Sequence, residues 1–89
     1  MPTYHLLITG KVQGVFFRRT AKDEADKLGI TGVVKNTGEG HVEIFFSGSD
    51  KDSDKFIEWC RNGPDRATVH HVEVESIEQR TFSGFSITR

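Results

Sequence analysis

The feature that most constrains the fold of this chain is the order in which strand-like and helix-like spacings of apolar residues occur along it. Apolar residues alternate with polar ones in some segments, as in half-buried strands, and recur every three or four positions in others, as in helices. The expected elements, in chain order, are a strand over Tyr4–Val12, a helix over Phe17–Leu28, strands over Ile30–Asn36 and Val42–Phe46, a helix from Asp50 up to Gly63, and strands over Val69–Ile77 and Phe82–Ile87. This βαββαββ order predicts an α+β fold, a ferredoxin-like α/β sandwich in which two helices pack on one face of a mostly antiparallel five-stranded sheet.

Glycine, proline and acidic residues mark the boundaries of these elements. Gly29 directly follows the first helical stripe and is expected to cap it, and Gly63-Pro64 is expected to end the second helix. The segment 37–40 contains two glycines and is expected to form a hairpin loop. Aspartates at positions 50, 52 and 54 suit the positive end of the second helix.

Length and charge exclude several classes of protein. The chain has 89 residues, which predicts one domain over residues 1–89. A chain of this size is by default a monomer or a small homo-oligomer, and we expect a monomer. Its 12 Lys and Arg against 13 Asp and Glu give a net charge of -1, whereas nucleic-acid-binding proteins usually carry a basic excess. No apolar run approaches the ~20 residues of a membrane span, and the first residues do not form a signal peptide. We therefore expect a cytoplasmic protein that binds neither nucleic acid nor membrane.

Metal-ligating residues are sparse in the sequence. Cys60 is the single cysteine, which excludes an intrachain disulfide and a cysteine cage for zinc. His70 and His71 are adjacent, so on a strand their side chains would point to opposite faces. We expect no metal and no cofactor, and we expect Cys60 to be a small buried hydrophobe on the second helix.

The segment Gly10–Arg19 departs from the usual charge pattern of a helix start. Arg18 and Arg19 lie where the helix dipole is positive, which costs about 0.3–1 kcal/mol for each exposed cation. An anion bound between arginine and the free N–H groups of a glycine-containing loop would offset that cost. Arginine also offers two parallel donors to phosphate or carboxylate oxygens. The alternative is that both arginines extend into solvent and that Gly14 is an ordinary turn residue.

Asn36 is a second candidate because it ends a predicted strand directly before the hairpin loop. Asparagine is common at turns, since it tolerates the left-handed conformation, so a structural role is the simplest interpretation. In a split βαβ fold, however, the first two strands can bring residues to neighbouring positions, and Asn36 could then approach the anion loop. Its neighbour Lys35 should point to the opposite face and is left out of the predicted site.

Two motifs in the chain resemble the signatures of the acylphosphatase family. The first is Ile8-x-Gly10-x-Val12-Gln13-Gly14-Val15-x-Phe17-Arg18, and the second runs from Gly32 through Val34-Lys35-Asn36 to Gly40, Val42 and Gly48. The first matches at every defined position, and the similarity extends over essentially the whole chain. Val33 and Asp65 stand where the family usually has an aromatic residue and a proline. Neither is expected to touch a bound phosphate.

The resemblance implies an enzyme that hydrolyses the carboxyl-phosphate bond of small acyl phosphates without a metal. The products are a carboxylate and inorganic phosphate, and phosphate is expected to inhibit. Carried over by position, Arg18 binds the substrate phosphate and Asn36 orients the attacking water. The backbone amides of the phosphate-binding loop cradle the phosphate oxygens, and its residues are Gln13, Gly14, Val15, Phe16 and Phe17. Arg19 is about 100° further around the helix and is expected to face solvent.

Alternatives from other classes remain open. An RNA-binding sheet needs exposed aromatic residues, and Phe45 lies on the solvent side of its strand, but no RNP1-type run surrounds it. A non-catalytic anion-binding regulatory module would keep the loop without hydrolysis, although such a protein has no need of Asn36 to orient water. Similar domains also form the front end of larger carbamoyl-phosphate-processing enzymes. We expect a freestanding protein, because no further module accompanies this one.

Overall fold

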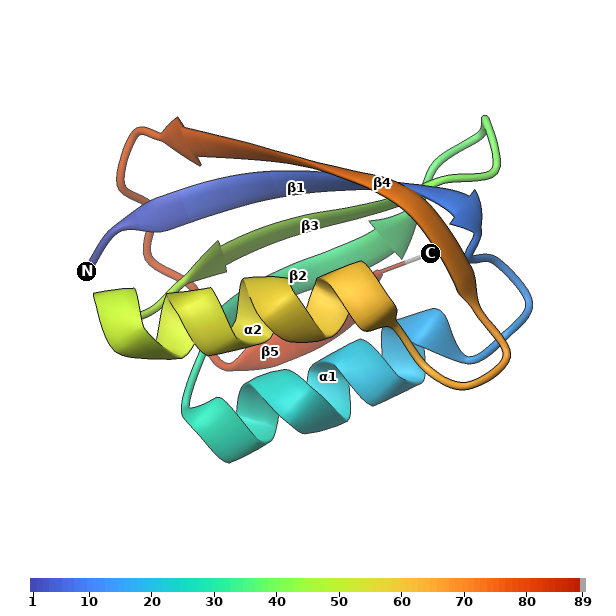
Figure 1. Cartoon of the computed structure of the whole chain (residues 1–89). Coiled ribbons are helices and arrows are strands. Elements are labelled where there is room, and N and C mark those ends of the chain that lie inside the picture. The colour runs from blue at the N-terminus through green and yellow to red at the C-terminus, as the bar shows by residue number, and fades with distance from the viewer. Residues whose placement is uncertain (89) are drawn as a thin grey trace.

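Two helices cover one face of a five-stranded sheet, as Figure 1 shows. The computed structural model describes residues 1–88, so the last residue of the predicted domain 1–89 lies outside the described residues. The elements are β1 (Thr3–Lys11), α1 (Phe17–Leu28), β2 (Thr31–Asn36), β3 (Val42–Ser47), α2 (Asp50–Asn62), β4 (Thr68–Ile77) and β5 (Phe85–Thr88). Within the described residues, no helix is both long enough and apolar enough to cross a bilayer.

The strands lie in the order β4-β1-β3-β2-β5. β1 pairs antiparallel with both β3 and β4, and β2 pairs antiparallel with β3, whereas β2 and β5 run parallel. The predicted α+β class, the βαββαββ order and the mostly antiparallel sheet are therefore confirmed, with a parallel pair at one edge. β4 and β5 occupy opposite edges, so the chain crosses the whole sheet between them (Figure 1).

The core lies between the sheet and the two helices. Successive strand residues point to opposite faces, so every second residue of β1 and β3 faces the helices. The buried residues on these two strands include Leu6, Ile8, Val42, Ile44 and Phe46. The predicted helical stripe faces them with Phe17, Ala21 and Ala25. Phe46 and Phe56 meet edge-on with their ring centroids 5.0 Å apart, which joins the sheet to α2.

Both helices end where the sequence predicts. Gly29 is left-handed, with φ 69°, and its N–H donates to the carbonyl of Asp26. The N–H of Ile30 donates to the carbonyl of Ala25, which completes a Schellman motif. α2 ends at Asn62, and Gly63 follows it with φ 68°.

The fifth strand begins later than its sequence pattern predicts. The alternation indicates a strand over Phe82–Ile87, but β5 spans Phe85–Thr88. Gly84 has φ 70°, which interrupts the extended backbone before Phe85. The carbonyl of Gly84 accepts a hydrogen bond of 2.9 Å from the N–H of Gly32, and the parallel pairing begins one residue later.

Gly32 is expected to be essential for the pairing of β2 with β3. A Cβ at this position would lie 2.7 Å from Cα of Phe46 and closer still to the carbonyl of Phe45, both backbone atoms. We expect Gly32→Ala to lower the free energy of unfolding by about 1–3 kcal/mol, the usual cost of overpacking, in urea denaturation. Gly38→Ala is the control, because a Cβ there meets nothing within 4 Å. Equal stability of the two variants would contradict this account.

Candidate functional site

The loop between β1 and α1 has an unusual backbone. Gly14 and Phe16 are left-handed, with φ 72° and 62°, whereas Val15 and Phe17 are not. An alternation of this kind turns successive N–H groups toward one side and forms a concavity that binds anions. For a residue other than glycine the left-handed region costs on the order of 1–3 kcal/mol, and such strain is concentrated at functional sites.

The N-terminus of α1 lacks the cap that α2 has. Among the described residues, no side chain caps the start of α1, and no acidic residue lies in its first turn. The hydroxyl of Ser49 accepts a hydrogen bond from the N–H of Asp52 at the start of α2, and Asp50 is in the same turn. The first N–H groups of a helix have no partner within the helix. An anion at the start of α1 would satisfy them.

The side chain of Gln13 ties this loop to the hairpin between β2 and β3. Its Nε2 donates to the carbonyl of Thr37 at 2.9 Å and to the carbonyl of His41 at 2.8 Å. The hairpin is itself closed by a hydrogen bond from the N–H of Thr37 to the carbonyl of His41. The loop therefore keeps a fixed position relative to the end of β2, where Asn36 lies.

A cavity of about 290 Å³ joins the loop to the end of β2. Its lining residues are Val12, Gly14, Phe16, Phe17, Arg18, Arg19, Asn36 and Ile87. The structure thus brings Arg18 and Asn36 to one cavity, together with three of the predicted loop residues. Gln13 and Val15 do not line it, because Gln13 reaches the hairpin and Val15 is buried in the core.

The two arginines at the start of α1 have different surroundings. Nη1 of Arg18 donates to the carbonyl of Thr88 on β5 over 3.4 Å, which places the guanidinium beside the cavity. Nε of Arg19 lies 3.6 Å from Oδ1 of Asp23, one turn further along the helix, and the Arg19 side chain is 73% exposed. The expectation that Arg19 faces solvent is confirmed for its charged end, although Arg19 also borders the cavity.

Asn36 and Lys35 lie on opposite faces of the sheet, as their adjacency predicts. Val34 and Asn36 share the face that the helices cover, and Val34 is fully buried there. Nζ of Lys35 lies 3.3 Å from Oε1 of Glu43 on the open face. The expectation that Lys35 points to the opposite face from Asn36 is therefore confirmed.

Ile87 is a lining residue that the sequence analysis missed. The parallel register pairs Ile87 with Val34, two residues before Asn36 on the same face. Alternation identifies the segment as a strand, but it does not indicate which edge of the sheet that strand joins. Knowledge of the parallel pairing with β2 would have located Ile87 at the cavity. That pairing joins segments far apart in the sequence, so local patterns do not reveal it.

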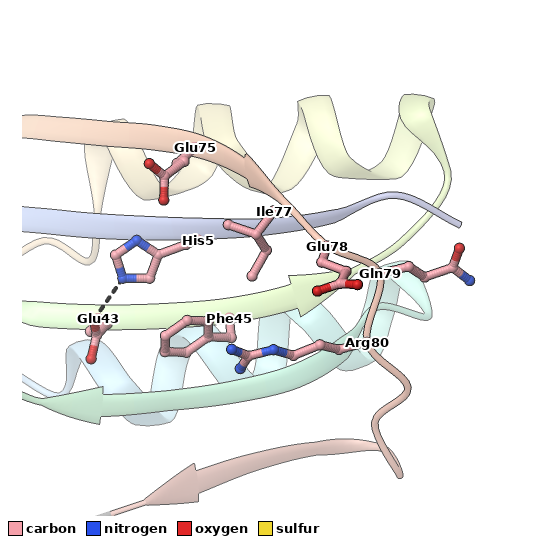
Figure 2. A pocket seen from close by; sticks show the side chains of 8 residues that line it. All are labelled: His5, Glu43, Phe45, Glu75, Ile77, Glu78, Gln79 and Arg80. Carbon is pink, nitrogen blue, oxygen red and sulfur yellow. Dashed lines mark hydrogen bonds and ion pairs between the residues drawn. The ribbon is translucent and has the colours of Figure 1, made fainter.

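A second cavity, of about 400 Å³, lies on the open face of the sheet (Figure 2). Figure 2 shows His5 directed toward Glu43, and Nε2 of His5 is 2.6 Å from Oε2 of Glu43. The guanidinium of Arg80 lies 4.8 Å from the centroid of the Phe45 ring. The carboxylates of Glu43, Glu75 and Glu78 border this cavity, and they disfavour a phosphate dianion. Among the described residues, an uncapped helix start, a loop with left-handed residues and an arginine lie together only at the cavity beside α1.

Neither the thiol nor the histidines form a reactive or metal-binding cluster in the part of the chain that the structure describes. Cys60 is fully buried, as predicted, and burial raises the pKa of its thiol. A reactive cysteine needs the opposite shift. His70 and His71 are both exposed on β4. Among residues 1–88, no group of three or more His, Cys, Asp or Glu is placed to hold a metal ion.

The sequence pattern of a known protein family matches nearly the whole chain. The family is described as Acylphosphatase, and residues 4–87 match it. The chain belongs to the acylphosphatase family. An acylphosphatase of Pelotomaculum thermopropionicum is 43% identical over 84 residues, which are 93% of this chain and 91% of that protein. One of Haloarcula marismortui is 39% identical over 83 residues, with the same coverage of both chains.

Solved acylphosphatase structures have the same fold over the whole chain. The enzyme from Bacillus subtilis superposes with a TM-score of 0.96 at 34% identity and covers 100% of both chains. An acylphosphatase from Coxiella burnetii gives a TM-score of 0.94 at 37% identity, over 98% of this chain and 92% of that one. The sequence resemblance to acylphosphatases is therefore confirmed.

Gln13 is expected to contribute to stability through its two hydrogen bonds to the hairpin. Gln13→Met keeps the length of the side chain and removes both bonds, each worth about 0.5–1.5 kcal/mol. We expect the free energy of unfolding in urea to fall by about 1–3 kcal/mol, and to fall further in Gln13→Glu, which faces two carbonyl oxygens with a carboxylate. The matched control is Gln79→Met, since Gln79 is exposed and points away from the sheet (Figure 2). An unchanged stability of Gln13→Met would rule out the anchoring role.

Proposed function

We propose that the protein hydrolyses acyl phosphates in the cavity between the β1–α1 loop and the end of β2. Arg18 binds the substrate phosphate, and the backbone N–H groups of residues 13–18 surround its oxygens. Asn36 orients the attacking water. The substrate is a small-molecule acyl phosphate, in keeping with the acylphosphatase family.

One observation carries the proposal: Arg18 and Asn36 line one cavity, and the loop that borders it leads into a helix start without a side-chain cap. Either residue alone has a simple structural explanation. Together they supply what hydrolysis of an acyl phosphate needs, which is charge stabilisation on one side of the phosphorus and a positioned water on the other.

The chemistry explains why so few groups suffice. The water oxygen forms a bond to phosphorus while the bond from phosphorus to the carboxylate oxygen breaks. The leaving carboxylate is a weak base, with a pKa near ~4 for a model carboxyl group, so it needs no general acid. Asn36 carries no base, so the proton of the water passes to a phosphate oxygen. An acyl phosphate dianion and water thus give a carboxylate monoanion and dihydrogen phosphate, which balances atoms and charge.

Stabilisation of the transferring phosphoryl group is the main task of the protein. Phosphoryl transfer passes through a loose transition state whose charge is spread over the phosphate oxygens, so positioning and electrostatics dominate catalysis. The guanidinium of Arg18 and the N–H groups of the loop place donors around those oxygens. The proposal also covers the protein as a whole. We expect residues 1–89 to form a single monomeric, cytoplasmic domain. Its activity should need no metal and should be inhibited by inorganic phosphate.

The first test is hydrolysis of benzoyl phosphate by the purified protein with a chelator present and no added metal. Turnover well above the uncatalysed rate is expected, with competitive inhibition by inorganic phosphate. Folded protein with no turnover would overturn the proposal and favour a non-catalytic anion-binding module.

Arg18→Ala is expected to lower kcat/KM by at least about 100-fold, because it removes the charged donor to the phosphate. Arg18→Lys should restore little, since a lysine lacks the paired donors of the guanidinium. Initial rates with benzoyl phosphate measure both effects. Arg19→Ala is the matched control, because the neighbouring arginine is exposed and paired with Asp23. A similar loss in the Arg19 variant would reassign the phosphate contact.

Asn36→Ala is expected to lower kcat by about 100-fold or more while the inhibition constant of inorganic phosphate changes little. A water-orienting amide acts on turnover, whereas a structural residue would weaken phosphate binding as well. Lys35→Ala is the control, as Lys35 is adjacent but lies on the open face. A parallel loss of turnover and phosphate affinity in Asn36→Ala would show that Asn36 only supports the loop.

A further inference from the structure

Two exposed apolar side chains border the cavity that holds Arg18. Among the described residues, the large hydrophobic side chains that are exposed are Met1, Phe16, Val74 and Ile87. Phe16 and Ile87 line the same cavity, although they lie far apart in the sequence. A single exposed hydrophobic residue needs no explanation. Two such residues that line one cavity beside the proposed phosphate site call for an explanation.

Neither the backbone nor the core explains the aromatic side chain at position 16. Phe16 is left-handed, with φ 62° and ψ 22°, and this conformation favours glycine or asparagine. Its side chain is 70% exposed, so it adds little to the core. The ring therefore occupies a position that a smaller residue would suit better unless the ring contacts a ligand.

Ile87 reaches the cavity through the parallel pairing of β5 with β2. Its partner Val34 is on the helix-covered face, and Asn36 follows on that face at the end of β2. The next residue on β5, Thr88, accepts the hydrogen bond from Arg18. Ile87 is thus held close to both proposed catalytic residues while it remains 39% exposed.

Beyond Arg18, the described residues of the cavity lining offer only one further cation to a second anionic group on the substrate. Arg18 is assigned to the phosphate. Arg19 is the other cation in the lining, and its Nε lies 3.6 Å from a carboxylate oxygen of Asp23. A carboxylate or second phosphate on the acyl group would therefore have to compete with Asp23 for Arg19.

We infer that Phe16 and Ile87 form a wall for the acyl group and make the enzyme prefer acyl phosphates with an uncharged, apolar acyl group. This inference rests on the proposed function, because it takes the phosphate to be bound by Arg18 and the loop. With the phosphate held there, the acyl group extends to the apolar part of the lining. Apolar surface on the acyl group is then removed from water, which favours its binding.

The test compares benzoyl phosphate with acetyl phosphate, which share the reacting group and differ in apolar surface. The measured quantity is the ratio of their kcat/KM values. Ile87→Thr keeps a branched strand residue and replaces apolar surface by a hydroxyl, and it should lower the ratio about 3- to 10-fold. Phe16→Asn suits the left-handed backbone and should lower the ratio similarly, whereas Ile87→Val should retain most of it.

Val74→Thr is the matched control, because Val74 is 40% exposed on β4 and does not line this cavity. The ratio of kcat/KM for benzoyl phosphate to kcat/KM for acetyl phosphate is expected to be the same in Val74→Thr as in the wild type. An unchanged ratio in both Ile87→Thr and Phe16→Asn, with the two substrates affected equally, would overturn the acyl wall and leave the proposed function standing. No hydrolysis of either substrate by the wild-type protein would overturn the proposed function and this inference with it.

Discussion

The register between β1, β3 and β2 decides where the proposed catalytic groups lie. Val42 of β3 is paired with Ile8 on one side and with Asn36 on the other, so the three strands are aligned at the end where the site forms. Neighbouring strands are about 4.8 Å apart, which places Asn36 two strand spacings, about 10 Å, from β1. A shift of one residue in β2 would turn Asn36 to the open face and bring Lys35 to the site.

The β1–α1 loop and the start of α1 contain three features that each raise the free energy of the folded state. Phe16 has a strained backbone, the start of α1 has no cap, and Arg18 lies at the wrong end of a helix dipole. α2, on the same face of the sheet, has a serine cap and acidic residues in its first turn. A bound phosphate would compensate all of these costs at once, because it supplies negative charge and hydrogen-bond acceptors in one place.

Local patterns were sufficient to predict most of the fold. Alternation and helical spacing identified every element, and the glycines at 29 and 63 identified the helix ends. The cations at the start of a helix indicated an anion site near Arg18, because the helix dipole disfavours positive charge there. The start of β5 was predicted three residues too early, because alternation alone does not reveal the left-handed turn at Gly84. The anchoring by Gln13 and the approach of Ile87 depend on contacts between distant segments, which spacing does not encode.

The parallel pair at the edge of the sheet ties the proposed site to the shortest strand. β5 has four residues and pairs with β2 alone, and elements of this kind are among the first to open locally. When β5 separates from β2, the cavity loses the side chain of Ile87, and Arg18 loses the carbonyl of Thr88. Phe85 is buried in the core, so such opening would be confined to Ile87 and Thr88 and would leave the rest of the sheet in place. If this cavity binds the acyl group as proposed, that binding should weaken on warming at a lower temperature than the one at which the core unfolds.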